Sequence, residues 1–111
     1  MNKKTKSLKE TFALAAQNYN KKDFKSAELI CKKILSIDSN HFDSTFLLAN
    51  LAIVQRNFIE AKKLLTKALE INPKSASANN NLGNIHKVLG ELNEAKNCYE
   101  KTIEMDPNNT N

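Results

Sequence analysis

The sequence repeats itself at a period of 34 residues, and this period constrains the fold more than any other feature of the chain. Three units follow one another without a gap, over 8–41, 42–75 and 76–109. Because one short helical unit cannot bury its apolar face alone, stacked copies must share a continuous core, which is typical of a solenoid. The matched positions are a leucine, a small residue, a large apolar residue and an alanine: Leu14, Leu48, Leu82; Ala15, Ala49, Gly83; Phe24, Phe58, Leu92; Ala27, Ala61, Ala95.

Each unit is predicted to form two helices around a polar break. The breaks fall at 21–23, 55–57 and 89–91. The small residues at positions 8 and 20 of the unit are expected where the two helices cross, because close approach leaves no room for longer side chains. Two glycines and two prolines in 111 residues leave little room for hairpins. The predicted fold class is therefore all-α.

Capping residues predict where these helices begin and end. Asp23 and Asn57 precede the second helices of their units and are good N-caps, whereas Glu91 is a weaker one. Ser75 is expected to cap the helix that follows it. The second helix of the middle unit should end before Pro73, because a residue that precedes proline is biased away from the helical conformation.

This pattern is similar to the tetratricopeptide repeat, whose marks are Leu-Gly, a pair of alanines, an aromatic residue and a closing proline. The third unit carries them most fully, with Asn-Leu-Gly-Asn at 81–84, then Ala95, Tyr99 and Pro107. The resemblance implies a right-handed α-solenoid of three helix-turn-helix units. The third unit departs from the family pattern at three positions: Asn79 replaces tryptophan, His86 replaces tyrosine and Thr102 replaces alanine.

Charge and composition exclude several classes of protein. Of the net charge of +5, a basic head at 1–7 carries +3 and the three units carry +2, +2 and −2 in order. The head is expected to be flexible, and 110–111 form a short tail. Arg56 is the only arginine and no strongly basic face is predicted, which argues against nucleic-acid binding. No apolar run is long enough for a signal peptide or a membrane span, so a cytoplasmic location is expected.

No motif for catalysis or cofactor binding occurs in the sequence. The glycine-rich phosphate and dinucleotide motifs, the nucleophile elbow and the zinc-protease helix are all missing. Cys31 and Cys98 lack the spacing of a zinc site or a disulfide framework. His41 is expected to be solvated in a linker and His86 to pack inward. We therefore expect no enzyme activity, no metal and no cofactor.

The resemblance places the binding surface on the first helices of the units, which line a concave groove in this family. It implies an apolar floor in the first two units and an asparagine-rich wall in the third. Amide side chains both donate and accept, so they could hold an extended peptide backbone. In the alternative interpretation, the large apolar residues pack among themselves and the asparagines are solvated. The implied groove residues are Phe12, Ala16, Tyr19, Phe46, Leu47, Asn50, Ile53, Asn80, Asn81, Asn84 and Lys87.

Co-chaperones of the family hold the C-terminal carboxylate of heat-shock proteins with a Lys-Asn-Asn-Lys-Arg set. The matching positions of this chain provide no cation, so the resemblance implies that this carboxylate clamp is absent. The five positions are occupied by Phe12, Ala16, Leu47, Ser77 and Asn81.

A protein or peptide partner is the first functional hypothesis, with a non-enzymatic interaction module as the role of the chain. Two alternatives stay open. The chain could be the N-terminal substrate-recruiting arm of a larger enzyme, for example a glycosyltransferase or sulfotransferase. It could also self-assemble, because no polar capping helix follows the third unit and its second helix is expected to expose Tyr99 and Ile103.

Overall fold

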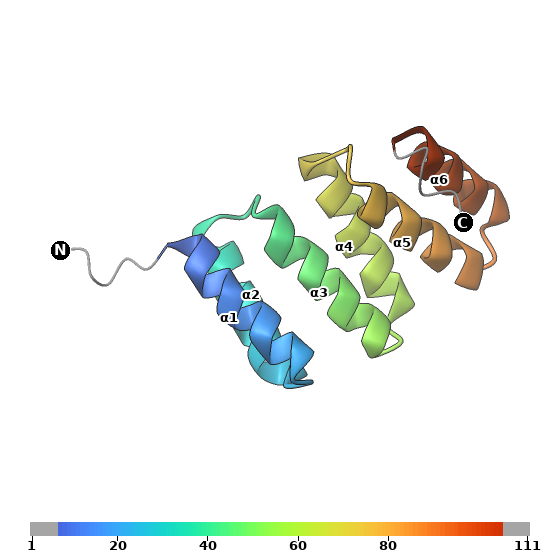
Figure 1. Cartoon of the computed structure of the whole chain (residues 1–111). Helices are drawn as coiled ribbons and strands as arrows, with labels where there is room; N and C mark the ends of the chain where they lie inside the picture. Colours follow the sequence, from blue (N-terminus) through green and yellow to red (C-terminus); the bar gives the residue numbers. More distant parts are fainter. Residues whose placement is uncertain (1–6, 106–111) are drawn as a thin grey trace.

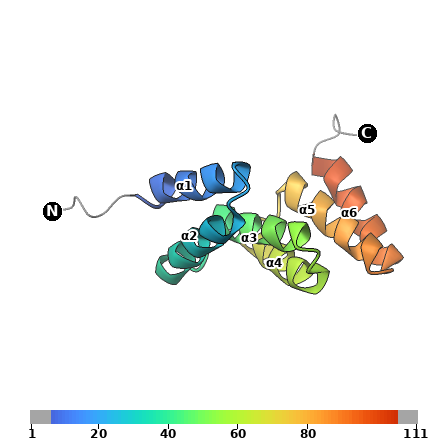
Figure 2. The same ribbon diagram turned by 90° about the horizontal axis from the view of Figure 1, so that it is seen from below.

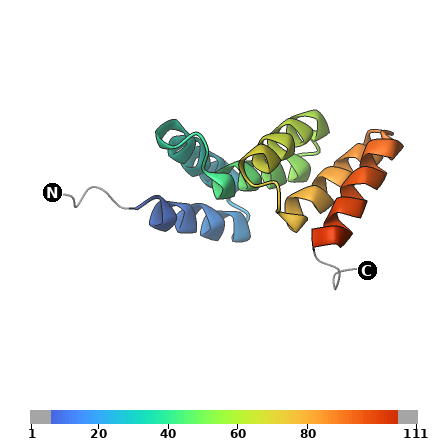
Figure 3. The ribbon, with the colours of Figure 1, turned by 90° about the horizontal axis from the view of Figure 1, so that it is seen from above.

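The computed structural model describes residues 7–105, which form six α-helices and no β-strand. Figure 1 shows that consecutive helices are joined in pairs and that the three pairs stand in a row. Two further views show α1 at one end of this row and α6 at the other (Figures 2 and 3). The predicted all-α, right-handed solenoid of helix-turn-helix units is confirmed. The helices are α1 (Leu8–Asn20), α2 (Phe24–Ile37), α3 (Phe42–Val54), α4 (Phe58–Ile71), α5 (Ala76–Val88) and α6 (Leu92–Met105).

The N-caps follow the sequence prediction. The side chains of Asp23, Asn57 and Ser75 accept hydrogen bonds from the backbone N–H three residues on, at 3.2, 3.4 and 3.1 Å. Each cap satisfies one backbone donor that the first turn of a helix leaves without a partner.

Ser7, the last residue of the predicted head, is the N-cap of α1. Its hydroxyl accepts from the backbone N–H of Glu10 at 3.1 Å, and its own N–H donates to the Glu10 carboxylate at 3.2 Å. This reciprocal pair is a capping box, which fixes the start of the helix. The rest of the predicted head and the predicted tail at 110–111 lie outside the described residues.

The break between the two helices has the same backbone conformation in all three units. Its central residue adopts a positive φ, at 67° for Lys22, 62° for Arg56 and 80° for Gly90. Glycine adopts this left-handed conformation without steric cost, whereas lysine and arginine do not. The packing of the two helices therefore imposes the turn, even where the local residue disfavours it.

The small residues of the repeat are buried between the helices of each unit. Ala15, Ala27, Ala49 and Ala61 have no exposed surface. In the third unit Gly83 takes the place of alanine, and a Cβ atom at this position would lie only 2.7 Å from the ring of Tyr99. Glycine is required there because the aromatic ring occupies the space of a methyl group.

Other repeat positions are buried only when a neighbouring unit covers them. The leucine at position 7 is 8% exposed at Leu82 but 42% exposed at Leu14. This side chain faces the preceding unit, and no described helix precedes α1. At the opposite end Ile103 is 48% exposed, whereas its counterpart Leu69 packs on the core that units two and three share.

Candidate functional site

The first helices of the units line two adjoining cavities, which together we call the groove. A cavity of about 280 Å³ lies between α3 and α5, and a cavity of about 480 Å³ lies beside it, where α1 meets α2. Tyr19 and Val54 line both cavities, so the groove crosses all three units. Its other residues are Asn50, Ile53, Phe58, Asn81, Asn84, Ile85 and Val88 in the first cavity, and Asn20, Lys22 and Phe24 in the second.

The asparagines of the groove are bonded within the chain. Asn81 donates its amide N–H to Asn50 Oδ1 at 3.2 Å, and the hydroxyl of Tyr99 donates to Asn84 Oδ1 at 2.6 Å. An asparagine amide offers two donors and accepts at its carbonyl oxygen. These bonds therefore orient the amides and still leave donors on Asn50 and Asn84 for a peptide main chain.

Five of the predicted groove residues line the cavity between α3 and α5, namely Tyr19, Asn50, Ile53, Asn81 and Asn84. Ala16, Asn80 and Lys87 do not line either cavity. The apolar wall of this cavity is Val54, Phe58, Ile85 and Val88. The resemblance implies a concave location for Val54 and Val88, which share position 13 of the repeat, whereas the sequence reasoning missed Phe58 and Ile85.

The large apolar residues predicted for the groove floor pack within the chain, as in the alternative interpretation. Leu47 is 7% exposed and lies in a core cluster with Ala15 and Cys31. Its side chain therefore lies in the core and not in the groove, because the first unit packs directly against this face of α3. Phe12 packs on the same cluster, and Phe46 stacks on the ring of Phe42 at 5.7 Å between centroids.

Tyr99 and Ile103, the residues predicted to be exposed at the open end, have different environments. Ile103 is exposed on α6. Tyr99 is half-buried, and its ring contacts Gly83 while its hydroxyl bonds Asn84. Tyr99 therefore supports the groove wall as well as bordering the end of the solenoid.

His41 was predicted to be solvated in a linker. Instead, it is the N-cap of α3. Its Nδ1 accepts from the backbone N–H of Ser44 at 3.2 Å and lies 2.9 Å from the Ser44 hydroxyl. The ring is half-buried and lies 5.9 Å from the ring of Phe12. The repeat register matches His41 with the cap Ser75, but the cap was missed because histidine is not among the preferred N-cap residue types.

His86 packs inward, as predicted, and belongs to an ion cluster between α4, α5 and the start of α6. Its Nδ1 lies 2.7 Å from Glu91 Oε1, and Lys62 Nζ lies 3.0 Å from Glu91 Oε2. The hydrogen bond from His86, followed by that from Lys62, lowers the pKa of the Glu91 carboxyl. Glu91 thus joins the second and third units by a charged contact.

The cysteines are poor nucleophiles at neutral pH. Burial raises the pKa of the Cys31 thiol to about 11, against a smaller opposing effect of a hydrogen bond with Ser44. Burial also raises the pKa of Cys98. Reactive cysteines need the thiolate form, which these environments disfavour.

Two further findings bear on the class of protein. Between residues 7 and 105, no three His, Cys, Asp or Glu side chains lie close enough together to hold a metal ion. None of the described helices is long and apolar enough to cross a membrane.

Three stacked helical hairpins with a groove along their first helices define a helical-repeat protein. Models of the tetratricopeptide repeat match this chain at residues 43–75 and 76–109. The chain therefore belongs to the tetratricopeptide repeat family. No curated protein matches its sequence.

Solved structures share the fold at low sequence identity. A Thermobaculum terrenum O-GlcNAc transferase mutant superposes with a TM-score of 0.85 at 24% identity, over 92% of this chain and 20% of that one. MamA superposes with a TM-score of 0.83 at 23% identity, over 91% of this chain and 59% of that one. The first tetratricopeptide domain of Spaghetti, bound to an HSP90 peptide, superposes with a TM-score of 0.85 at 20% identity, over 92% of this chain and 81% of that one. The chain thus spans only part of the first two proteins.

Proposed function

We propose that this chain is a non-catalytic interaction module that binds an extended segment of a partner protein in the groove. The observation that carries the proposal is the apolar wall of the groove beside oriented amides. Val54 and Val88 are 45% and 58% exposed, although both line a concave cavity. Exposed apolar surface in a concavity is typical of a contact site.

The geometry suits a peptide with one large apolar residue. Its side chain enters the cavity between α3 and α5 and is buried against Ile53, Val54 and Val88. The main chain of the peptide accepts hydrogen bonds from the amides of Asn50 and Asn84. These hydrogen bonds do not depend on the other side chains of the peptide. The apolar residue thus gives the specificity, and the amides fix the extended conformation.

The HSP90 peptide on the Spaghetti domain supports peptide binding by this fold, but the chemistry proposed here differs from the family's carboxylate clamp. Among the clamp positions, Phe12 is packed, Leu47 is buried and Asn81 is bonded to Asn50. None of them carries a positive charge, so a C-terminal carboxylate has no cation to pair with there. A larger enzyme that used this chain as a recruiting arm would use the same groove.

The test begins with selection of peptides from a random display library on the immobilised chain. Selected peptides are then titrated by calorimetry into the wild type, Val88→Glu and Ile59→Glu. Ile59 is 62% exposed on α4 and does not line the groove, so it is the matched control. A buried unpaired charge should weaken binding at least about tenfold in Val88→Glu. Equal affinities for the wild type and Val88→Glu would refute the proposal.

Association of copies through the exposed face of α6, at the end of the solenoid, is a second candidate, which the exposed residues of that helix favour. Leu92 and Ile103 are 64% and 48% exposed, whereas their repeat counterparts Phe58 and Leu69 pack on the core between units. Light scattering at increasing concentration should then show oligomers that Leu92→Ser with Ile103→Ser removes. A monomer at all concentrations refutes this candidate.

A further inference from the structure

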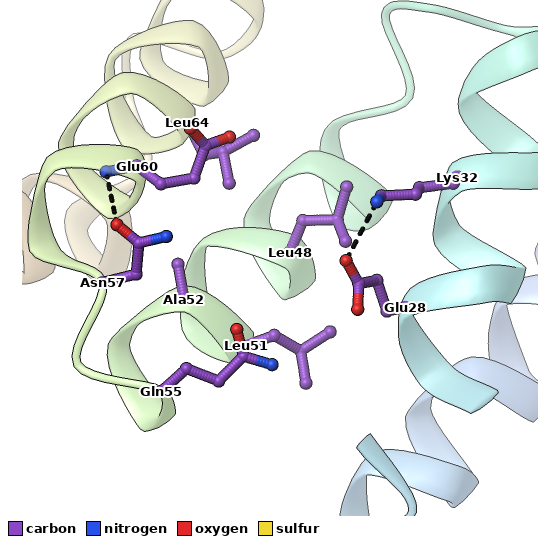
Figure 4. Close-up of a pocket in the computed structure, with 9 residues that line it drawn as sticks. All are labelled: Glu28, Lys32, Leu48, Leu51, Ala52, Gln55, Asn57, Glu60 and Leu64. Carbon is purple, nitrogen blue, oxygen red and sulfur yellow. Dashed lines mark hydrogen bonds and ion pairs between the residues drawn. The ribbon is translucent and has the colours of Figure 1, made fainter. Parts of the chain in front are cut away.

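A second concavity, which we call the back cleft, opens between α2, α3 and α4 and has a volume of about 280 Å³ (Figure 4). It shares no residue with the groove. On α3 the two sites use opposite faces of the helix, because side chains turn by 100° per residue. The groove uses Asn50, Ile53 and Val54 of α3, and the back cleft uses Leu48, Leu51 and Ala52 of α3 together with its C-cap, Gln55.

The back cleft exists because the junction between units one and two lacks a side chain that the next junction has. Ala52 of the second unit corresponds to His86 of the third. The His86 side chain is 14% exposed and occupies the matching place at the second junction, where it lies 2.7 Å from the Glu91 carboxylate. The cavity that does open at the second junction, beside Leu82, is lined by neither His86 nor Glu91. Alanine leaves the volume of the His86 side chain empty at the first junction. Leu48, which borders the back cleft, is accordingly half-buried, whereas its counterpart Leu82 is buried.

The charges around the two junctions differ as well. Lys62 on α4, which pairs with Glu91, corresponds to Glu28 on α2, and Glu91 itself corresponds to Asn57. The first junction thus has a carboxylate where the second has an ammonium group. Glu28 is bonded to Lys32 at 2.9 Å, while the Glu60 carboxylate makes no ion pair with any residue in 7–105. The lining of the back cleft carries two carboxylates and one ammonium group.

We propose that the back cleft is a docking site for an arginine side chain of a partner protein. Leucine side chains and Ala52 form its wall, against which the aliphatic part of the arginine lies. The guanidinium then reaches the carboxylates of Glu60 and Glu28 at the rim. Arginine suits this site better than lysine, because its planar, weakly hydrated head matches a carboxylate with two donors. His86 with Glu91 is the intramolecular precedent, since it places a flat N–H-bearing group between apolar residues and a carboxylate.

The experiment uses N-acetyl-arginine methylamide as the probe and N-acetyl-citrulline methylamide as its uncharged isostere. Methyl signals of Leu48, Leu51 and Leu64 are followed by NMR during titration into the full chain. The arginine probe should shift these signals in a saturable manner and bind about threefold more tightly than citrulline, as expected for an exposed ion pair. The methyl signals of Leu82 should not move, because the cavity of about 320 Å³ that Leu82 lines has a single carboxylate, Glu70, and also contains the ammonium group of Lys101.

Two variants make the test specific. Ala52→His should remove the saturable shifts by filling the back cleft, and a melting curve with unchanged Leu82 signals shows that the variant folds. Glu60→Gln is an exposed substitution that should reduce the preference for arginine over citrulline, because only the Glu28 carboxylate, which Lys32 also pairs, remains. Glu94→Gln, on α6, is the charge-matched control and should bind like the wild type. Equal binding of the two probes by the wild type, or equal shifts at Leu82, would overturn the proposal.

Discussion

Replacement of Gly83 by alanine tests how strictly the two helices of a unit are matched in size. Position 8 and position 24 of each unit form a contacting pair across the helix crossing. The second and third units combine Ala49 with Leu65 and Gly83 with Tyr99. A larger residue on the second helix therefore requires a smaller one on the first.

The magnitude follows from two opposing effects. Helix propensity alone favours alanine over an interior glycine by about 1 kcal/mol. The new Cβ atom, however, would lie 2.7 and 2.9 Å from two ring carbons of Tyr99 and 3.2 Å from Cys98 Cβ. Displacing the ring costs about 1–3 kcal/mol of overpacking, and losing its hydrogen bond with Asn84 costs about 1 kcal/mol more. The net expectation is a loss of about 2 kcal/mol of unfolding free energy.

Urea unfolding of four proteins measures this effect. The proteins are the wild type, Gly83→Ala, Tyr99→Leu and the double variant, which recreates the Ala49 and Leu65 pair of the second unit. Gly83→Ala should destabilise the chain when tyrosine is present and stabilise it when leucine is present. A Gly83→Ala protein that is more stable than the wild type would refute the argument from packing.

Three further predictions rest on other contacts. Combining Ala52→His, Asn57→Glu and Glu28→Lys copies the second junction onto the first, but Asn57→Glu also removes the N-cap of α4, at a cost of about 1 kcal/mol. The triple variant should therefore be more stable than Asn57→Glu alone by about 1 kcal/mol; equal urea midpoints of these two proteins contradict the prediction. Because its partners lower the pKa of Glu91, its stabilisation is present above pH 4.5 and lost as pH falls through the folded-state pKa. Between about pH 6 and about pH 3, the melting temperature of the wild type should therefore fall further than that of Glu91→Gln. An equal fall in both proteins would contradict a stabilising contact between Glu91 and its partners. For Cys31, a rise in pKa from 9.0 to about 11 lowers the thiolate fraction about a hundredfold. In a Cys98→Ser background, iodoacetamide should therefore modify Cys31 at least about a hundredfold more slowly in the native protein than in the unfolded one. Similar rates in the two states would mean that the thiol is accessible.

The repeat period made the fold predictable from sequence alone. Without gaps, the register assigns each residue to a helix and a face, and the caps at Asp23, Asn57 and Ser75 are local features of a few neighbouring residues. Five of the residues expected in the groove line the cavity between α3 and α5, because first-helix positions face one side of a solenoid. Local spacing and stacking order were sufficient for these features.

Burial at the junctions was not predictable in the same way. The register assigned Leu47 to the groove, but its side chain is buried because the first unit packs closely on α3. The back cleft lies beside one small residue, Ala52, at the repeat position that His86 occupies in the third unit. His41 acts as an N-cap although the residue type gives a weak signal. Such features depend on the side chains at the contact between two particular units. The repeat pattern records only what all units share, so it does not show them.

The proposed groove is tested most directly by locating the side chain of a bound peptide. Intermolecular NOEs are measured between the apolar residue of a library-selected peptide and the methyl groups of the isotope-labelled chain. The proposal predicts contacts to Val54 and Val88, on α3 and α5. Contacts confined to Leu29 and Ile59, which are exposed outside the groove on α2 and α4, would contradict it.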